Sequence, residues 1–226
     1  MHYRRENPPA WIPATPERSI AGRVADDLAC QIVEGTLEAG TTLTEVDVAT
    51  RCGVSRTPVR ESMLRLQAWG LVRIAPKKGA TVTVPTERER RELLTVRSML
   101  ETDIVRRTAD DPDARTRLAG LLADTVAEQR GSTDDPERFA DLDFAFHSHI
   151  IHFDDNRVVT EISGLLAPRL ARLTFLAVRS MAGNLDAVID EHTALTDAVS
   201  RGDVSAFEDL IQAHLTGMHG RYEVAR

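Results

Sequence analysis

The sequence of 226 residues has little of several residue types, and each shortage excludes a class of protein. Its two cysteines, Cys30 and Cys52, are too few for a disulfide framework, so we expect reduced thiols. No apolar run approaches the ~20 residues that a membrane-spanning helix needs. The charged N-terminal segment is not followed by the apolar stretch of a signal peptide. These absences predict a cytoplasmic protein with no membrane partner.

Lysine is scarce as well, and negative charge prevails over the whole chain. There are 26 arginines but only two lysines, the neighbours Lys77 and Lys78. The formal net charge is −7, which taken alone argues against nucleic acid as the partner. However, residues 1–85 carry 11 Lys and Arg against 9 Asp and Glu, whereas residues 86–226 carry 17 against 26. A mildly basic front and an acidic back indicate two domains with different partners.

Two segments make up the front of the chain. Residues 1–17 contain four prolines and no apolar periodicity, which predicts a flexible tail. Residues 18–85 follow as three helices and a β-hairpin, the order of elements in a winged helix-turn-helix domain. The expected helices run from an N-cap at Ser19 to Gly35, from a capping box at Thr44 to about Cys52, and from an N-cap at Ser55 to Gly70; the strands span 71–74 and 80–84.

Residues 86–226 show no convincing strand and are typical of an all-helical antiparallel bundle. Clusters of Asp, Asn, Gly and Pro separate the helical segments. The chain as a whole is therefore expected to be mainly α, with an N-terminal winged helix-turn-helix domain and a C-terminal all-helical antiparallel bundle. The six expected helices are 87–109, 113–130, 136–153, 157–182, 185–200 and 203–224.

The third expected helix presents Arg56, Thr57 and Arg60 on a face separate from its apolar stripe. An arginine can donate two hydrogen bonds to guanine in the DNA major groove. At the hairpin turn, Lys77–Gly79 places two positive charges where a phosphate or minor-groove contact is possible. Either feature alone is more often a solvated face or an ordinary polar turn, but together they favour DNA binding.

Four polar residues of the back domain occupy positions where the helical pattern demands apolar ones. They are Asp143, His147, His192 and His214, from three expected helices. A single histidine of this kind is usually a hydrogen-bonded core residue. One carboxylate and three imidazoles facing inward instead suit a divalent transition metal, for which zinc or nickel is expected.

Two arginines, Arg97 and Arg169, also lie on apolar stripes of their helices. A buried guanidinium needs an anion. One interpretation is an internal ion pair, for Arg97 with Glu101 or Asp103. The other is a clamp on the carboxylate of a bound effector beside the metal.

The segment Gly53–Ser62 resembles the recognition-helix signature of the GntR family of bacterial transcription regulators, and Gly35–Leu43 and Gly70–Val72 fit the same pattern. The resemblance implies that Arg56 and Arg60 contact an operator and that Gly79 lies at the wing tip. One departure concerns a Glu–Arg pair that the family often has at the start of the second helix. Here the pair is Glu45–Val46, so one DNA contact is expected to be missing.

The back domain resembles the FCD ligand-binding domain of the FadR-like branch of that family, and its six helices are similar to the shorter VanR-type members. The resemblance implies a metal bound by Asp143, His147, His192 and His214, and a small carboxylate effector that contacts the metal and a nearby arginine. The matching segments are Val96–Glu101, Asp143–His147, Glu191–His192 and Ala213–Leu215.

We therefore expect a ligand-responsive transcription repressor that binds a pseudo-palindromic, double-stranded DNA operator as a homodimer. The effector would be a small organic acid. A metal-dependent hydrolase or lyase fused to a DNA-binding module is a second hypothesis, although the sequence offers no clear general base beyond the expected ligands. In a third hypothesis the metal is purely structural.

Overall fold

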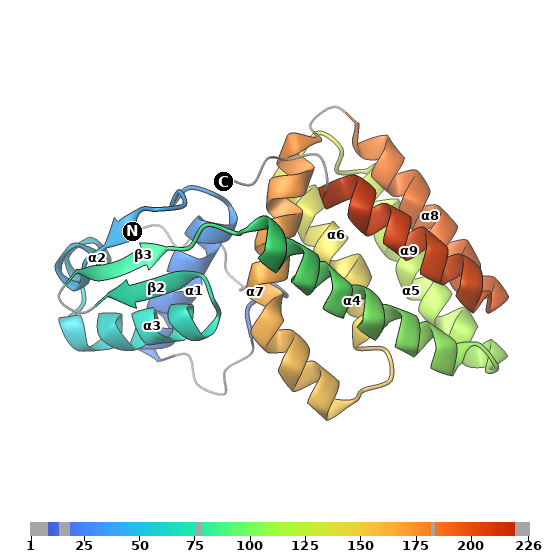
Figure 1. Ribbon diagram of the computed structural model, residues 1–226, viewed down its shortest axis with the longest axis horizontal. Coiled ribbons are helices and arrows are strands. Elements are labelled where there is room, and N and C mark those ends of the chain that lie inside the picture. Colours follow the sequence, from blue (N-terminus) through green and yellow to red (C-terminus); the bar gives the residue numbers. More distant parts are fainter. Residues whose placement is uncertain (1–8, 14–18, 76–77, 182–183, 220–226) are drawn as a thin grey trace. The chain divides into compact units, whose positions relative to one another are not determined.

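The computed structural model describes residues 9–13, 19–75, 78–181 and 184–219, which fall into two compact units (Figure 1). The first unit comprises Met1–Pro85 and Gly164–Arg172, and the second comprises Thr86–Ser163 and Leu173–Arg226. The described residues form nine α-helices and one small antiparallel sheet, so the predicted fold class is confirmed. Within these ranges, no helix has both the length and the hydropathy to cross a bilayer.

The first unit has the winged helix-turn-helix order that the sequence predicts. Helix α3 packs against both α1 and α2, and the apolar side chains of Val59, Met63 and Leu66 form its buried face. The elements are α1 (Ile20–Val33), β1 (Thr42–Leu43), α2 (Glu45–Cys52), α3 (Arg56–Ala68), β2 (Val72–Ala75) and β3 (Gly79–Val82).

Two of the three expected helix caps in this unit are formed. Ser19 and Thr44 each accept a hydrogen bond from a backbone N–H group of the following turn at 3.1 Å. Ser55 stands at the N-cap position of α3, but its side chain makes no cap hydrogen bond, so that part of the prediction is wrong. Gly53 ends α2 with a φ of 65°, which glycine adopts without strain.

The sheet contains one strand more than the expected hairpin. Strand β1 has only two residues, too few to show an alternating pattern in the sequence. The strand order is β1-β3-β2, and Ala80 of β3 pairs with Leu43 on one side and Ile74 on the other. Gly79 begins β3 with a φ of 88°, and a Cβ atom there would lie 2.4 Å from the carbonyl oxygen of Leu43. The close approach of β1 therefore requires glycine at this end of the hairpin.

Part of the segment that we expected to be a flexible tail is packed against the fold. The side chains of Trp11 and Ile12 are only 1% and 7% exposed. Burying two apolar side chains orders the backbone that carries them, so the expectation of flexibility is wrong for 9–13. The remainder of 1–17 lies outside the described residues.

The described part of 86–226 forms six helices, the number that the sequence predicts, and all but Gly164–Arg172 of α7 belong to the second unit. Helix α5 packs against α6 and α8, and α9 packs against α4 and α8; Figure 1 shows α4 and α9 side by side. Phe139 and Phe146 of α6 and Phe207 of α9 are fully buried in the core. The helices are α4 (Glu87–Thr108), α5 (Pro112–Arg130), α6 (Pro136–Ile151), α7 (Arg157–Ser180), α8 (Leu185–Arg201) and α9 (Val204–His219).

Candidate functional site

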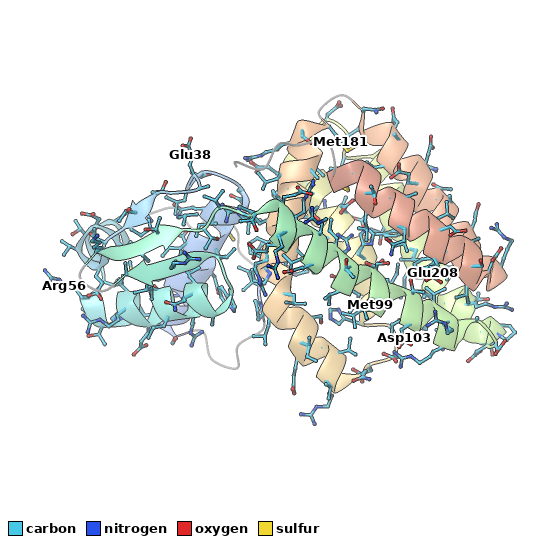
Figure 2. All side chains as sticks on the ribbon, in the orientation of Figure 1. Glu38, Arg56, Met99, Asp103, Met181 and Glu208 are labelled. Atoms are coloured by element: carbon cyan, nitrogen blue, oxygen red, sulfur yellow. The ribbon has the colours of Figure 1, made fainter. Side chains whose placement is uncertain are left out.

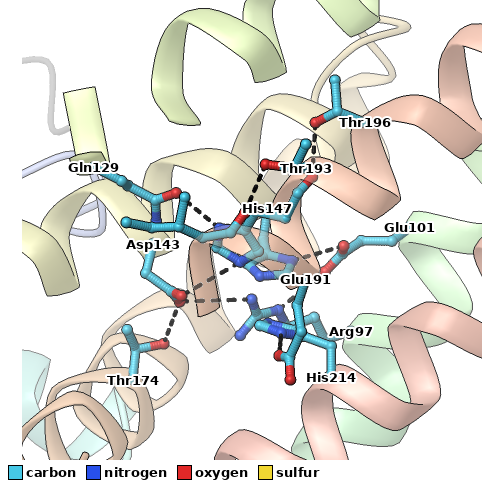
Figure 3. A network of polar contacts seen from close by, with 12 residues as sticks. Arg97, Glu101, Gln129, Asp143, His147, Thr174, Glu191, Thr193, Thr196 and His214 are labelled. Atoms are coloured by element: carbon cyan, nitrogen blue, oxygen red, sulfur yellow. Dashed lines mark hydrogen bonds and ion pairs between the residues drawn. The ribbon is translucent and has the colours of Figure 1, made fainter. Parts of the chain in front are cut away.

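The second unit brings the four predicted metal ligands together in its core (Figure 3). Asp143 and His147 lie four residues apart on α6, which places both side chains on one face of that helix. His192 comes from α8 and His214 from α9. All four are at most 2% exposed, and one ligand atom from each lies within 4.8 Å of the others.

A second layer of side chains fixes the three imidazole rings. In each histidine, Nδ1 is hydrogen-bonded to a side-chain oxygen of a different helix. Such a bond sets the tautomer and directs Nε2 towards the metal in histidine-ligated sites. The pairs are His147 with Glu101 of α4 at 2.8 Å, His192 with Gln129 of α5 at 2.8 Å, and His214 with Glu191 of α8 at 2.7 Å.

Several polar atoms at the centre of the cluster lack a hydrogen bond. Asp143 Oδ1 and the Nε2 atoms of His192 and His214 are buried and make no hydrogen bond to any described residue. His192 Nε2 lies 3.5 Å from Asp143 Oδ1. Buried polar atoms without partners cost free energy, unless an additional group satisfies them. The carboxylate and imidazole atoms therefore fit a divalent transition metal ion in both position and chemistry.

Burial also sets the protonation of these groups. It lowers the pKa of His192 well below its ordinary value, so the ring is neutral and has a lone pair to offer a metal. It raises the pKa of Asp143, and the charge of Arg97 opposes this effect. It also raises the pKa of Glu101 to about 7, again against the charge of Arg97. A cation at the centre would stabilise the carboxylate forms that burial disfavours.

Arg97 lies at the edge of this cluster and is 2% exposed. Its Nε donates a hydrogen bond to Glu101 at 3.0 Å, so of the two ion-pair partners that we considered, Glu101 is the observed one. Its Nη2 lies 4.0 Å from Asp143 and makes no hydrogen bond within the described parts of the chain. The ion pair with Glu101 therefore accounts for Nε, whereas Nη2 is directed at the cluster.

The side chain of Arg169 lies against Gly70, within the first unit. It lies in Gly164–Arg172, the part of α7 that belongs to the first unit. Thr174 is the residue of α7 that meets the cluster, through a 3.5 Å hydrogen bond to Asp143. Thr174 follows Arg169 by five positions, which turns the two side chains about 140° apart around the helix. The expected role of Arg169 in effector binding therefore gains no support.

The first unit exposes the side chains predicted to contact DNA. Arg56, Thr57 and Arg60 are exposed on α3, and Figure 2 shows Arg56 projecting from the start of that helix. Lys78 is exposed in the turn before Gly79. Lys77, predicted to act with them, lies outside the described residues.

The sequence did not lead us to predict two residues that contact these sites, Gln129 and Glu45. Gln129 follows Leu118, Leu122 and Val126 on the buried face of α5, so a polar residue on an apolar stripe was the available signal. Glu45 forms a two-bond ion pair with Arg60, at 2.8 and 2.9 Å. No sequence pattern indicates that pairing, because the two residues are 15 positions apart in different helices.

Two family models match the chain. The model for bacterial regulatory proteins of the gntR family matches residues 20–82, and the FCD domain model matches residues 92–217. The gluconate operon transcriptional repressor of Bacillus licheniformis is 26% identical over 223 residues, covering 96% of this chain and 89% of the relative. The HTH-type transcriptional repressor RspR of Escherichia coli (strain K12) is 25% identical over 203 residues, covering 88% and 87%.

Solved structures show the same fold. E. coli McbR/YncC has a TM-score of 0.68 at 24% identity, covering 91% of this chain and 99% of that one. A transcriptional regulator GntR from Rhodococcus sp. RHA1 has a TM-score of 0.72 at 23% identity, covering 90% and 99%. The matched families and relatives are transcription regulators, so the comparisons favour regulation over the enzyme hypothesis.

Proposed function

Since the chain belongs to the GntR family of bacterial transcription regulators and carries an FCD domain, we propose that it is a repressor controlled by a small carboxylate. The first unit would read the operator, and the second would bind the effector at a metal centre. The effector must bind the DNA-competent and DNA-incompetent states with different affinity, because otherwise it shifts no equilibrium.

DNA reading is assigned to α3 of a homodimer on a pseudo-palindromic operator. Two recognition helices would enter successive major grooves, with Arg56 and Arg60 donating to base edges and Thr57 positioned beside them. Lys77, Lys78 and the turn at Gly79 would contact the backbone. The exposure of Arg56 and Arg60 on α3, outside its buried stripe, supports this assignment.

The metal centre is assigned to Asp143, His147, His192 and His214, with zinc or nickel as the ion. The observation that carries this proposal is the fixed second layer, in which all three Nδ1 atoms are already bonded to Glu101, Gln129 and Glu191. When bound, the metal supplies positive charge and, with a coordination number above four, positions for an effector oxygen.

The effector class follows from the charges around this centre. Arg97 Nη2 is buried, lies 4.0 Å from Asp143 and makes no hydrogen bond to a described residue, so this edge of its guanidinium can still donate to an anion. A carboxylate can accept from that edge and meet the metal at the same time. One relative is named for a gluconate operon, which makes a hydroxycarboxylate the first compound to test.

A thermal-shift screen of gluconate and other mono-, di- and tricarboxylates tests the proposal, on metal-loaded and on chelator-treated protein. We expect a carboxylate to raise the melting temperature only when the metal is present. His147→Ala should abolish this response, whereas His149→Ala serves as the matched control, because His149 is exposed on the same helix. An equal shift after chelation would instead support a metal with a purely structural role.

A further inference from the structure

Arg60, on the outer face of α3, is held by an acidic residue of α2. Its Nε donates a hydrogen bond to Glu45 Oε1 at 2.8 Å, and its Nη2 donates to Oε2 at 2.9 Å. The side chains of Arg60 and Glu45 are 69% and 29% exposed. The pair therefore joins the two helices of the helix-turn-helix at the surface predicted to face DNA.

The two donor atoms define which edge of the guanidinium is occupied. Nε and Nη2 form its side edge, whereas Nη1 and the second N–H of Nη2 form its end edge. Guanine is recognised by two parallel N–H groups that donate to O6 and N7. The end edge of Arg60 can make those two bonds while its side edge stays on Glu45.

We propose that Glu45 is a positioning residue for base recognition, which holds the Arg60 guanidinium so that its end edge meets a guanine in the major groove. This inference rests on the proposed function, because it requires α3 to enter that groove. The benefit is selectivity: a long side chain that is already ordered loses less conformational entropy when it binds, and it is less able to adapt to a wrong base.

The charge of Glu45 supports a positioning role. The hydrogen bond from Arg60 lowers the pKa of Glu45, and the charge of Arg56 acts in the same direction, so the carboxylate is ionised at neutral pH. A carboxylate beside DNA repels the phosphates and weakens binding to any sequence. Improved discrimination between bases would offset that loss.

Glu45 also stands at the first position of α2, where a carboxylate favours the helix dipole. A purely structural role at that helix terminus is therefore the competing explanation. Glu45→Asp separates the two, because it keeps the charge at the helix terminus while its shorter side chain cannot keep both bonds to Arg60. Glu61→Gln is the control for loss of one negative charge, since Glu61 is exposed beside Arg60 on α3.

The experiment uses the full chain and a library of DNA duplexes with a randomised core, and the bound duplexes are sequenced. Arg60→Ala should lose the guanine preference at one position in each half-site. Glu45→Gln and Glu45→Asp should lose roughly tenfold discrimination at that same position and keep the preference read by Arg56. Glu61→Gln should keep both preferences.

Three results would overturn the inference. An unchanged base preference in both Glu45 variants would leave Glu45 with no part in reading. A sharper preference would mean that Glu45 competes with guanine for Arg60. If the wild-type protein enriches no sequence, the proposed DNA-reading function fails, and the role of Glu45 fails with it. If the wild-type protein enriches a sequence and both Glu45 variants keep its base preference in full, only the positioning role is rejected.

Discussion

Gln129 illustrates how a single buried side chain can orient a candidate metal ligand. It is fully buried on α5, and its carbonyl oxygen holds His192 Nδ1 at 2.8 Å. The corresponding partners of His147 and His214 are carboxylates, so Gln129 is the neutral member of this second layer. A neutral acceptor orients the ring without adding negative charge to the cluster.

Replacing Gln129 with leucine should weaken metal binding by roughly 10–100-fold, because His192 loses the bond that orients its ring. Competition with a chromophoric chelator measures the change. Gln129→Glu is the matched variant, since it keeps an acceptor for Nδ1 and should retain tight binding. Equal metal affinity in the leucine variant and the wild type would show that the second layer does not position the ligand.

Two glycines with opposite surroundings give a test of the wing geometry. Gly79 has a φ of 88°, and an added Cβ would lie 2.4 Å from Leu43 O, whereas nothing lies within 4 Å of a Cβ added to Gly120. Gly79→Ala should therefore destabilise the first unit by about 1–3 kcal/mol. Gly120→Ala, inside α5, should stabilise the protein by ~0.5–1 kcal/mol. Urea unfolding measures both, and two effects of the same sign would contradict the geometry.

At the scale of elements, the order of helices and strands could be predicted because it depends on local periodicity and turn residues. The six helices of the second unit begin and end within a few residues of their expected positions, except α9, whose described part ends at His219. Strand β1 could not be predicted, because a two-residue strand is created by its partner β3 rather than by its own pattern.

The candidate site was predictable to the same extent, through polar residues on apolar stripes. That signal identifies Asp143, His147, His192 and His214, but it does not show which face of a long helix meets them. Arg169 is a polar residue on the apolar stripe of α7, yet Asp143 is contacted by Thr174 of that helix. Cross-helix pairs such as Glu45 with Arg60 depend on packing angles that the sequence does not display.

The proposed recognition helix α3 leads to a further prediction, about DNA affinity. Arg56 is exposed at the first turn of α3, so its removal should leave the fold intact. Arg56→Ala should weaken binding to a selected operator by roughly 1–3 kcal/mol, while binding to unrelated duplex falls much less. Fluorescence anisotropy with both duplexes measures the two affinities. An equal loss of affinity for both duplexes would indicate that Arg56 contacts only the phosphate backbone.

For the whole molecule, the uneven charge is consistent with two functions on one chain. Negative charge is concentrated in residues 86–226, and residues 1–85 carry only a small positive excess. Specific DNA binding would then depend on a few placed cations and on dimerisation rather than on a strongly basic surface. The acidic second unit is suited to holding a cation in its core, where four polar side chains replace part of the apolar packing.

Metal removal should therefore lower the stability of the second unit. Without a cation, the buried atoms Asp143 Oδ1, His192 Nε2 and His214 Nε2 make no hydrogen bond to a described residue. The stabilisation by binding is also lost, which is about 2.7 kcal/mol for a metal present at 100 times its Kd. Thermal unfolding before and after chelation, followed by re-addition of zinc or nickel, measures this change. An unchanged melting temperature throughout would argue that the cluster binds no metal.

The most direct test of the central claim is the metal content of the purified protein. Elemental analysis should find one divalent transition metal ion per chain in the wild type and in His149→Ala, whose altered side chain is exposed. The double variant His147→Ala/His192→Ala should contain none while remaining folded by circular dichroism. Stoichiometric metal retained in that double variant would contradict the assignment of the site.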